Sequence, residues 1–225
     1  MKASIPKPTA MASVILLSSL FHSKSALADG FPAPSFAAAR MSDVGLRPFS
    51  VAVNDFNGDS KLDLVVANEG SHPDHDGGGV SVFMSKGDGT FQAGANYGAG
   101  TNLSTVAAGD LNGDSKPDLI VAYADGRVSM LLGNGDGTFQ SGSNSSAGTN
   151  PVFVAVSDFN GDGKLDLAIA NSGSDNVSVL LGRGDGTFRA PVGYGVGSGP
   201  QFVAVADLNG DGKLDLAVAN MGRYD

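Results

Sequence analysis

The feature that most constrains the fold is a nine-residue acidic segment that occurs four times. The clearest copy, Asp158–Asp166, reads D-F-N-G-D-G-K-L-D, and the others begin at Asp55, Asp110 and Asp207. Each copy has Asp or Asn at positions 1, 3, 5 and 9 and lies between two apolar runs. Asn, Asp and Gly all favour tight turns, so one copy alone could be only a turn. A turn does not require the Asp at position 9, and its presence in all four copies favours cation binding.

The oxygen-rich pattern predicts a site for Ca²⁺, which takes roughly six to eight oxygen ligands in flexible geometry. Side chains at positions 1, 3, 5 and 9 would supply oxygens, with a backbone carbonyl at position 7 and water for the rest. An EF-hand is excluded, because it needs a Glu at position 12 and flanking helices. Here an apolar residue inside a strand-like run occupies that position.

The acidic segments mark a longer repeat with intervals of 55, 48 and 49 residues. Apolar runs flank each segment, and a third run follows at 80–84, 128–132 and 177–181. Gly-Asp-Gly-Thr-Phe then closes the repeat at 87–91, 135–139 and 184–188, which is a hairpin signal because primed turns need positive φ. A looser fourth strand is expected around Tyr97 and Tyr194. Four antiparallel strands in about 50 residues predict an all-β protein built from β-propeller blades.

The repeated pattern V-A-V-x-D-F-N-G-D-G-K-L-D-L-A-V-A-N, followed by V-S-V-L-L-G-x-G-D-G-T-F, resembles the FG-GAP/VCBS repeats, which are also seen in the propeller of integrin α chains. The resemblance covers about residues 47–225. It implies a propeller of usually seven blades, with Ca²⁺ in loops between the first and second strands, and up to four ions for this chain. The implied ligands are Asp55, Asn57, Asp59, Lys61 (carbonyl), Asp63, Asp110, Asn112, Asp114, Lys116 (carbonyl), Asp118, Asp158, Asn160, Asp162, Lys164 (carbonyl), Asp166, Asp207, Asn209, Asp211, Lys213 (carbonyl) and Asp215.

Position 6 departs from the repeat pattern in two loops, where Ser60 and Ser115 replace Gly. Position 6 is where the chain must turn sharply, and we expect left-handed backbone there. A residue with a Cβ costs about 1 to 2 kcal/mol in that conformation. The first two loops are therefore expected to bind Ca²⁺ less tightly than the third, which has Gly163.

The chain divides into three parts. Residues 1–28 have a basic start, a short apolar run and an Ala26-Leu27-Ala28 end, which predict a secretory signal peptide and an extracellular or periplasmic protein. Residues 29–47 are a lead-in with an edge strand expected at 35–39. Repeats begin near 48, 103, 151 and 200, and the last is incomplete, so fifteen strands and part of a larger ring are expected. Open sheet edges would favour self-association.

Composition excludes several functions. The net charge of −9 becomes −12 without Lys2, Lys7 and Lys24, and an acidic chain is unsuited to nucleic acid. Cysteine is absent, which excludes disulfides and thiolate chemistry. After the signal peptide no segment is apolar enough to span a membrane.

The remaining motifs are weak. His72 and His75 lie in a loop insertion that is read as a solvated tip rather than a transition-metal site. Arg183-Gly184-Asp185 occupies the repeat's hairpin position and is read as a turn rather than an adhesion motif. The sequence therefore predicts a non-catalytic, exported, calcium-binding propeller module that binds an extracellular protein or glycan. The alternatives are the propeller portion of a secreted polysaccharide-acting enzyme and a lectin, the latter weakened by the absence of Trp.

Overall fold

The computed structural model describes residues 13–16, 40–70, 78–97 and 102–222, which form strands and turns without a helix. The strands are β1 (Ser13–Leu16), β2 (Arg40–Asp43), β3 (Pro48–Asn54), β4 (Asp63–Asn68), β5 (Gly79–Ser85), β6 (Phe91–Tyr97), β7 (Leu103–Gly109), β8 (Asp118–Tyr123), β9 (Arg127–Gly133), β10 (Phe139–Ser146), β11 (Pro151–Ser157), β12 (Asp166–Asn171), β13 (Asn176–Leu180), β14 (Val192–Gly195), β15 (Pro200–Ala206) and β16 (Asp215–Asn220).

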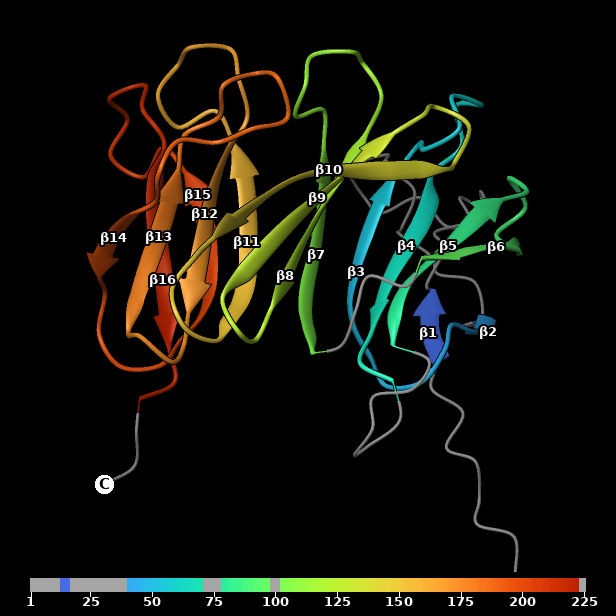
Figure 1. Cartoon of the computed structure of the whole chain (residues 1–225), viewed down its shortest axis with the longest axis horizontal. Helices are drawn as coiled ribbons and strands as arrows, with labels where there is room; N and C mark the ends of the chain where they lie inside the picture. Colours follow the sequence, from blue (N-terminus) through green and yellow to red (C-terminus); the bar gives the residue numbers. More distant parts are fainter. Residues whose placement is uncertain (1–12, 17–39, 71–77, 98–101, 223–225) are drawn as a thin grey trace, which may run out of the picture.

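Consecutive strands pair in antiparallel order to form propeller blades (Figure 1). The first blade is β3–β6, the second β7–β10 and the third β11–β14, each a four-stranded sheet. β15 and β16 pair as a half-blade. The predicted blade architecture is confirmed, including the looser fourth strands that contain Tyr97 and Tyr194.

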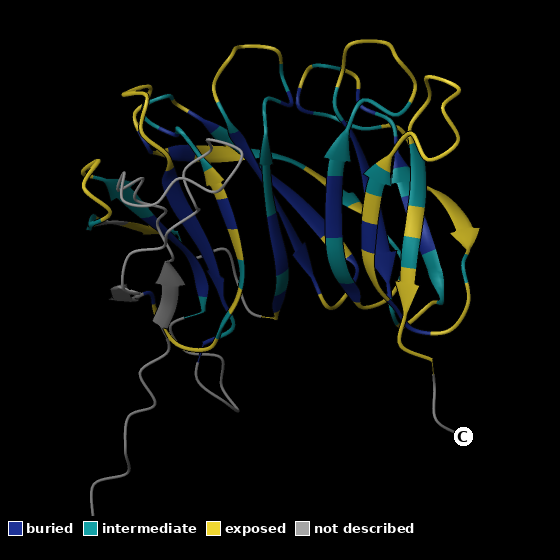
Figure 2. Cartoon of the chain, turned by 180° about the vertical axis from the view of Figure 1, so that it is seen from behind, coloured by how far each residue is buried: buried dark blue, intermediate teal, exposed yellow. Residues whose placement is uncertain are grey.

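The second strand of each complete blade is buried along its whole length, in β4, β8 and β12. Neighbouring sheets cover both faces of β8 and β12, and for that reason the sequence shows a continuous apolar run in these strands instead of an alternating one. β16 has the same sequence pattern but is half-buried or exposed at every residue. The half-blade therefore has an open side, which Figure 2 shows in yellow and teal.

The first strands of successive blades lie against one another, β3 with β7, β7 with β11, and β11 with β15. Each first strand has a register shift at its second residue, next to Pro48, Leu103, Pro151 and Pro200. The shift recurs in all four repeats, so it is a built feature of the blade. Such a bulge increases the local twist of a strand.

Three apolar cores lie between consecutive blades. The first joins Val65 and Val80 of the first blade to Val121 of the second. Leu167 and Leu180 of the third blade belong to the second core, and the third core lies between the third blade and the half-blade. The protein is therefore stabilised by packing between neighbouring repeats, as in other repeat architectures.

The region before the repeats differs from expectation. The predicted lead-in strand at 35–39 lies outside the described residues, and the structure has two strands there, β1 and β2, which pair with each other. β1 falls inside the expected signal peptide, whose other residues are not described, and neither are residues 71–77 with His72 and His75. No described residue belongs to a helix that is long and apolar enough to cross a membrane.

Candidate functional site

The four acidic segments form the loops between the first and second strand of each blade, as the sequence predicts. These loops are largely exposed and project from one end of the blades (Figure 2). Each brings its five predicted ligand positions together within one short turn. The structure does not join positions from different loops into one site.

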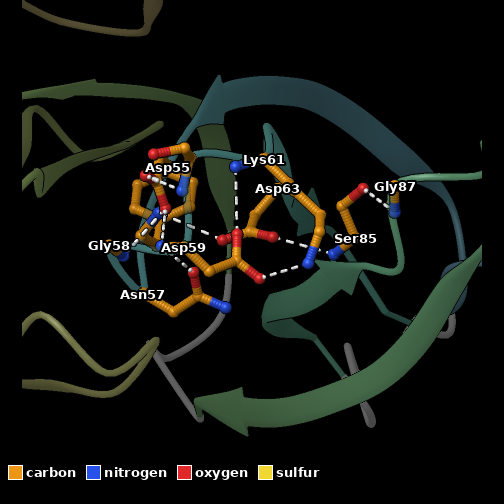
Figure 3. A network of polar contacts seen from close by, with 10 residues as sticks. Asp55, Asn57, Gly58, Asp59, Lys61, Asp63, Ser85 and Gly87 are labelled. Atoms are coloured by element: carbon orange, nitrogen blue, oxygen red, sulfur yellow. Dashed lines mark hydrogen bonds and ion pairs between the residues drawn. The ribbon is translucent and has the colours of Figure 1, made fainter.

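The carboxylate at position 1 organises each loop by accepting hydrogen bonds from the loop backbone, as Figure 3 shows for the first loop. Asp55 Oδ1 accepts from the N–H groups of Gly58 and Asp59 at 2.8 and 3.1 Å, and Oδ2 accepts from Ser60 N–H at 2.7 Å. Asp110, Asp158 and Asp207 make the same three contacts. The hydrogen bonds from Gly163 and Gly212 lower the pKa values of the Asp158 and Asp207 carboxyls.

Position 6 has left-handed backbone in all four loops, which confirms the prediction. φ is 63° at Ser60 and 64° at Ser115, against 80° at Gly163 and 82° at Gly212. Ser is held there because its N–H donates to the position 1 carboxylate. The first two loops thus maintain a conformation that costs about 1 kcal/mol or more for a residue with a Cβ.

Positions 3 and 5 also accept backbone hydrogen bonds. Asn57 Oδ1 accepts from Asp59 N–H, and Asp59 Oδ1 accepts from Lys61 N–H, both at 3.0 Å. In the first loop, Lys61 Nζ lies 3.0 Å from Asp59 Oδ2, and this hydrogen bond lowers the pKa of Asp59. A cation bound at this loop would have to compete with Lys61 for Asp59.

Position 9 is buried and differs from the other positions. Asp63, Asp118 and Asp166 have 0% exposure, whereas Asp215 is half-buried. Asp63 Oδ2 accepts from Phe56 N–H at 3.0 Å, and its Oδ1 accepts from Ser85 N–H at 2.8 Å (Figure 3). The carboxylate therefore ties the start of the loop to the end of the third strand.

The same tie recurs in the other complete blades. Asp118 accepts from Leu111 and Gly133, and Asp166 from Phe159 and Gly182. In the half-blade, Asp215 Oδ2 accepts from Leu208 N–H at 3.0 Å, and a third strand is not among the described residues. Position 9 is predicted from the sequence only as a metal ligand, and its contact with the third strand is not predicted.

Burial raises the pKa of Asp118, and the negative charges of Asp114 and Asp110 raise it further. The carboxylates of one loop therefore repel each other. A cation at the loop would relieve this repulsion.

The donor set fits a hard cation, because it consists of carboxylate, amide and carbonyl oxygens in a loop of fixed shape. The oxygen donors of a loop do not surround a common point in this structure. Among the described residues, no group of three or more His, Cys, Asp or Glu side chains is arranged around a metal position. The carboxylates point instead to backbone N–H groups.

The Gly-Asp-Gly hairpins have a second function that the sequence analysis missed. Gly137 N–H of the second blade donates to Phe56 O in the first loop at 2.9 Å, and Gly186 N–H of the third blade donates to Leu111 O at 3.1 Å. Each of these two hairpins is thus hydrogen-bonded to the acidic loop of the preceding blade, and we call this contact the hook. The recurrence of Gly-Asp-Gly-Thr-Phe in three repeats was the sequence signal that could have suggested it.

The Arg183-Gly184-Asp185 segment is the third of these hairpins. Positive φ at Gly184 and Gly186 confirms the predicted turn. Asp185 Oδ1 accepts hydrogen bonds from the backbone N–H and side-chain hydroxyl of Thr187, which lower the pKa of Asp185. The Asp is therefore engaged within its own turn.

A buried Asn–Ser pair links the second and third strands in two blades. Asn68 Nδ2 donates to Ser81 Oγ, and Asn171 Nδ2 donates to Ser178 Oγ, both at 2.9 Å. In the second blade Tyr123 replaces the Asn, and Ser129 donates instead to Asn144 Oδ1 at 2.7 Å. In both of these blades an Ala-Asn pair ends the second strand and Val-Ser-Val lies in the third. This combination is the sequence signal from which the Asn–Ser contact could have been predicted.

A hollow of about 700 Å³ lies along the first strands of the blades. Phe49 and Phe153 contribute aromatic surface, and Thr105, Asn150 and Gln201 contribute polar groups. This hollow could not be predicted from the sequence, because its residues come from four separate repeats. Its volume lies in the range of ligand pockets.

Two solved structures share the fold. BBS1N, solved in complex with ARL6DN, is 15% identical with a TM-score of 0.54, over 92% of this chain and 58% of that one. A protein from Lactobacillus plantarum is also 15% identical with a TM-score of 0.54, over 85% of this chain and 56% of that one. The chain thus spans somewhat more than half the length of these relatives. No curated protein sequence matches it.

The FG-GAP-like repeat family matches the chain three times, at residues 55–121, 110–169 and 158–218. Each match starts at an acidic loop and runs into the next repeat, which agrees with the repeat read from the sequence. Because the matches together span residues 55 to 218, well over half of the chain, the protein belongs to the FG-GAP-like repeat family.

Proposed function

We propose that the protein is a non-catalytic binding module that holds an extracellular protein or glycan in the hollow along its first strands. The observation that carries the proposal is the composition of that hollow, in which exposed aromatic surface is combined with amide and hydroxyl groups. Phe49 is 59% exposed, so its ring is free to pack against a ligand. Large aromatic rings supply much of the binding energy at protein interfaces and also stack on sugar faces.

A binding screen against glycans and matrix proteins tests this proposal, with Phe49→Ala as the probe variant. Because Phe49 is exposed, its truncation should leave folding intact and weaken binding by roughly tenfold or more. Val192→Ala is the matched control, since Val192 is 54% exposed but lies outside the hollow on β14. Equal binding by both variants would place the ligand elsewhere. A glycan hit would favour a lectin, and a protein hit an adhesion module.

Calcium binding at up to four acidic loops is the second part of the proposal. The oxygen donors, the left-handed turns and the mutual repulsion of carboxylates in the second loop support it. A bound ion would supply positive charge and hold the loop oxygens together. Metal that binds only the native state at a hundredfold excess over Kd adds about 2.7 kcal/mol of stability. EGTA should therefore lower the Tm and added Ca²⁺ restore it, whereas identical melting curves would remove calcium from the proposal.

Export is the third part. Repeats of this family are typical of extracellular proteins, and the Ala26-Leu27-Ala28 sequence supports cleavage after Ala28. N-terminal sequencing of secreted protein should begin at Asp29. A secreted or cell-associated product that keeps Lys2 would contradict this.

A further inference from the structure

The sequence Asn-Gly-Asp occurs five times, and the fold places one of these copies differently from the rest. Four copies form positions 3 to 5 of the acidic loops, and they begin at Asn57, Asn112, Asn160 and Asn209. The fifth begins at Asn134 in the hairpin of the second blade, where the other two hairpins have Lys86 and Arg183. Because the asparagine and the two residues after it are the same in all five copies, differences in their reactivity should come from the fold.

An asparagine that precedes a glycine is prone to lose its side-chain amide in water. The Gly nitrogen gives its proton to hydroxide and attacks the side-chain carbonyl carbon of the asparagine, which closes a succinimide ring and releases ammonia. Water then opens the ring to aspartate or, by adding at the backbone carbonyl, to isoaspartate, whose main chain is longer by a methylene. The net reaction converts asparagine and water into an acid and ammonia. A following Gly favours it, because no Cβ hinders the approach of the nitrogen.

The acidic loops protect their asparagines from this reaction. In each loop the N–H of the Gly at position 4 donates to the position 1 carboxylate at 2.7 or 2.8 Å. A negatively charged acceptor disfavours loss of the amide proton, and the attack requires this charge-assisted hydrogen bond to break. The Asn side-chain oxygen also accepts from the backbone N–H at position 5, at 2.9 or 3.0 Å, which restricts rotation of the side chain.

The hairpin of the second blade lacks this protection. Asn134 is exposed, and no described residue accepts a hydrogen bond from Gly135 N–H. In the first hairpin, Gly87 N–H donates to Ser85 Oγ at 3.1 Å, but Gly133 replaces this serine in the second hairpin. The nitrogen of Gly135 is therefore available next to an exposed side-chain amide.

We propose that Asn134 is a site of spontaneous deamidation, and that its conversion weakens the hook between the first two blades. Asn134 Nδ2 donates to Thr138 Oγ1 at 2.8 Å, and a carboxylate has no proton with which to replace this donor. The Thr138 hydroxyl already donates to Asp136, so the new carboxylate would meet the negative charge of Asp136 without a donor from Thr138. In the isoaspartate product the longer main chain also shifts Gly137, whose N–H donates to Phe56 O at 2.9 Å. The proposal depends on neither ligand nor calcium binding.

Peptide mapping of the full chain by mass spectrometry tests the site. After incubation in mildly alkaline buffer with EDTA, Asn134 should be converted at least about tenfold faster than each of the four loop asparagines, because the loops must first give up a hydrogen bond to a charged group. In urea the five rates should be similar. Equal rates in the folded chain, or a difference that persists in urea, would overturn the proposal.

A loop variant tests whether the hydrogen bond is the cause of the protection. Asp158→Ala releases Gly161 N–H and should speed the conversion of Asn160 at least about tenfold, while Asn57 in the same molecule keeps its rate. Circular dichroism checks that the variant folds. If it does not, Asp110→Ala is the replacement and is read at the asparagine of its own loop. An unchanged rate in a folded variant would overturn the argument from the hydrogen bond.

A hairpin variant tests the same cause in the opposite direction. Arg183→Asn places Asn-Gly-Asp in the third hairpin, where Gly184 N–H also has no acceptor among the described residues. This change should add a second site that is converted as fast as Asn134. A new site that reacts as slowly as the loop asparagines would contradict the proposal.

Amide hydrogen exchange on the incubated protein measures the effect on the hook. The Gly137 amide should exchange faster after conversion, whereas the Gly186 amide, which makes the equivalent contact in the third blade, should not change. Asn134→Gln keeps the side-chain amide but would have to close a larger ring, so its Gly137 amide should stay protected through the same incubation. Unchanged exchange at Gly137 in converted protein would refute the weakening of the hook.

Discussion

Replacing Asp166 by Ala should destabilise the protein far more than the same change at Asp215. Both residues occupy position 9 of an acidic loop with nearly identical sequence. Asp166 is fully buried and accepts hydrogen bonds from Phe159 N–H at 3.0 Å and Gly182 N–H at 2.7 Å. Asp215 is half-buried and accepts from Leu208 N–H at 3.0 Å, beside an exposed side chain.

The magnitude follows from the donors that lose their partner. A buried N–H left without an acceptor costs about 1 to 3 kcal/mol, so Asp166→Ala should cost about 2 to 6 kcal/mol. The substitution also removes the cost of burying the Asp166 carboxylate. This gain brings the expected loss of stability to the lower half of the range. Asp215→Ala leaves one donor that water can reach, and should cost about 1 kcal/mol or less.

Urea denaturation in EDTA measures the loss of unfolding free energy in both variants in the absence of bound metal. Amide hydrogen exchange locates them, because the amides of Phe159 and Gly182 should lose protection in Asp166→Ala while amides in the first blade keep theirs. This local readout matters because an array of repeats need not unfold in one step. Equal losses for the two variants in EDTA would refute the reasoning. A loss that appears only with Ca²⁺ would mean that position 9 acts through the metal and not through the third strand.

The remaining predictions concern the turns, the hook and pH. Ser60→Gly and Ser115→Gly should each raise the free energy of unfolding by up to about 1 kcal/mol, because φ is already left-handed; unchanged urea midpoints would contradict this. Gly137→Ala should destabilise more than Gly89→Ala, since φ is 80° and 79° but only a Cβ at 137 would have to displace a side chain of the preceding blade, that of Met84; equal melting temperatures would argue against close packing of this hairpin on the first blade. In EDTA, the Asp158 carboxylate adds to the free energy of unfolding because its pKa is lowered in the folded state. This contribution is present above the ordinary Asp pKa and is lost as the pH falls through the lowered value. Asp158→Asn should therefore flatten the acid side of a stability–pH curve, and a parallel curve would refute the assignment.

The fold could be predicted because its signals are local. The buried runs of β4, β8 and β12 are apolar without alternation, and that identifies strands covered on both faces. The left-handed turns were readable because Gly recurs at position 6 in two loops and Ser replaces it in the others. Each of these inferences uses residues within one repeat.

The site was only partly predictable because its remaining contacts are not local. Asp63 and Ser85 are 22 residues apart in sequence, and spacing alone does not reveal that a carboxylate turns inward to the third strand. For the same reason Asp63, Asp118 and Asp166 were read only as metal ligands. The hook from Gly137 to Phe56 joins different repeats, and the repeat pattern does not specify how one blade is placed on the next.

The acidic loop is therefore a structural junction as well as a candidate metal site. Position 1 holds the loop backbone, the carbonyl at position 2 accepts the next blade's hairpin, and position 9 holds the third strand of its own blade. A cation bound to positions 1, 3, 5 and 9 would order the same residues that make these contacts. Metal binding in one loop should thus stabilise two blades, because the hook at position 2 lies between the ligands at positions 1 and 3. In the half-blade, the loop has the position 1 contacts, and no third strand is among the described residues. The stabilisation of this loop by a bound cation should therefore depend least on the rest of its own blade.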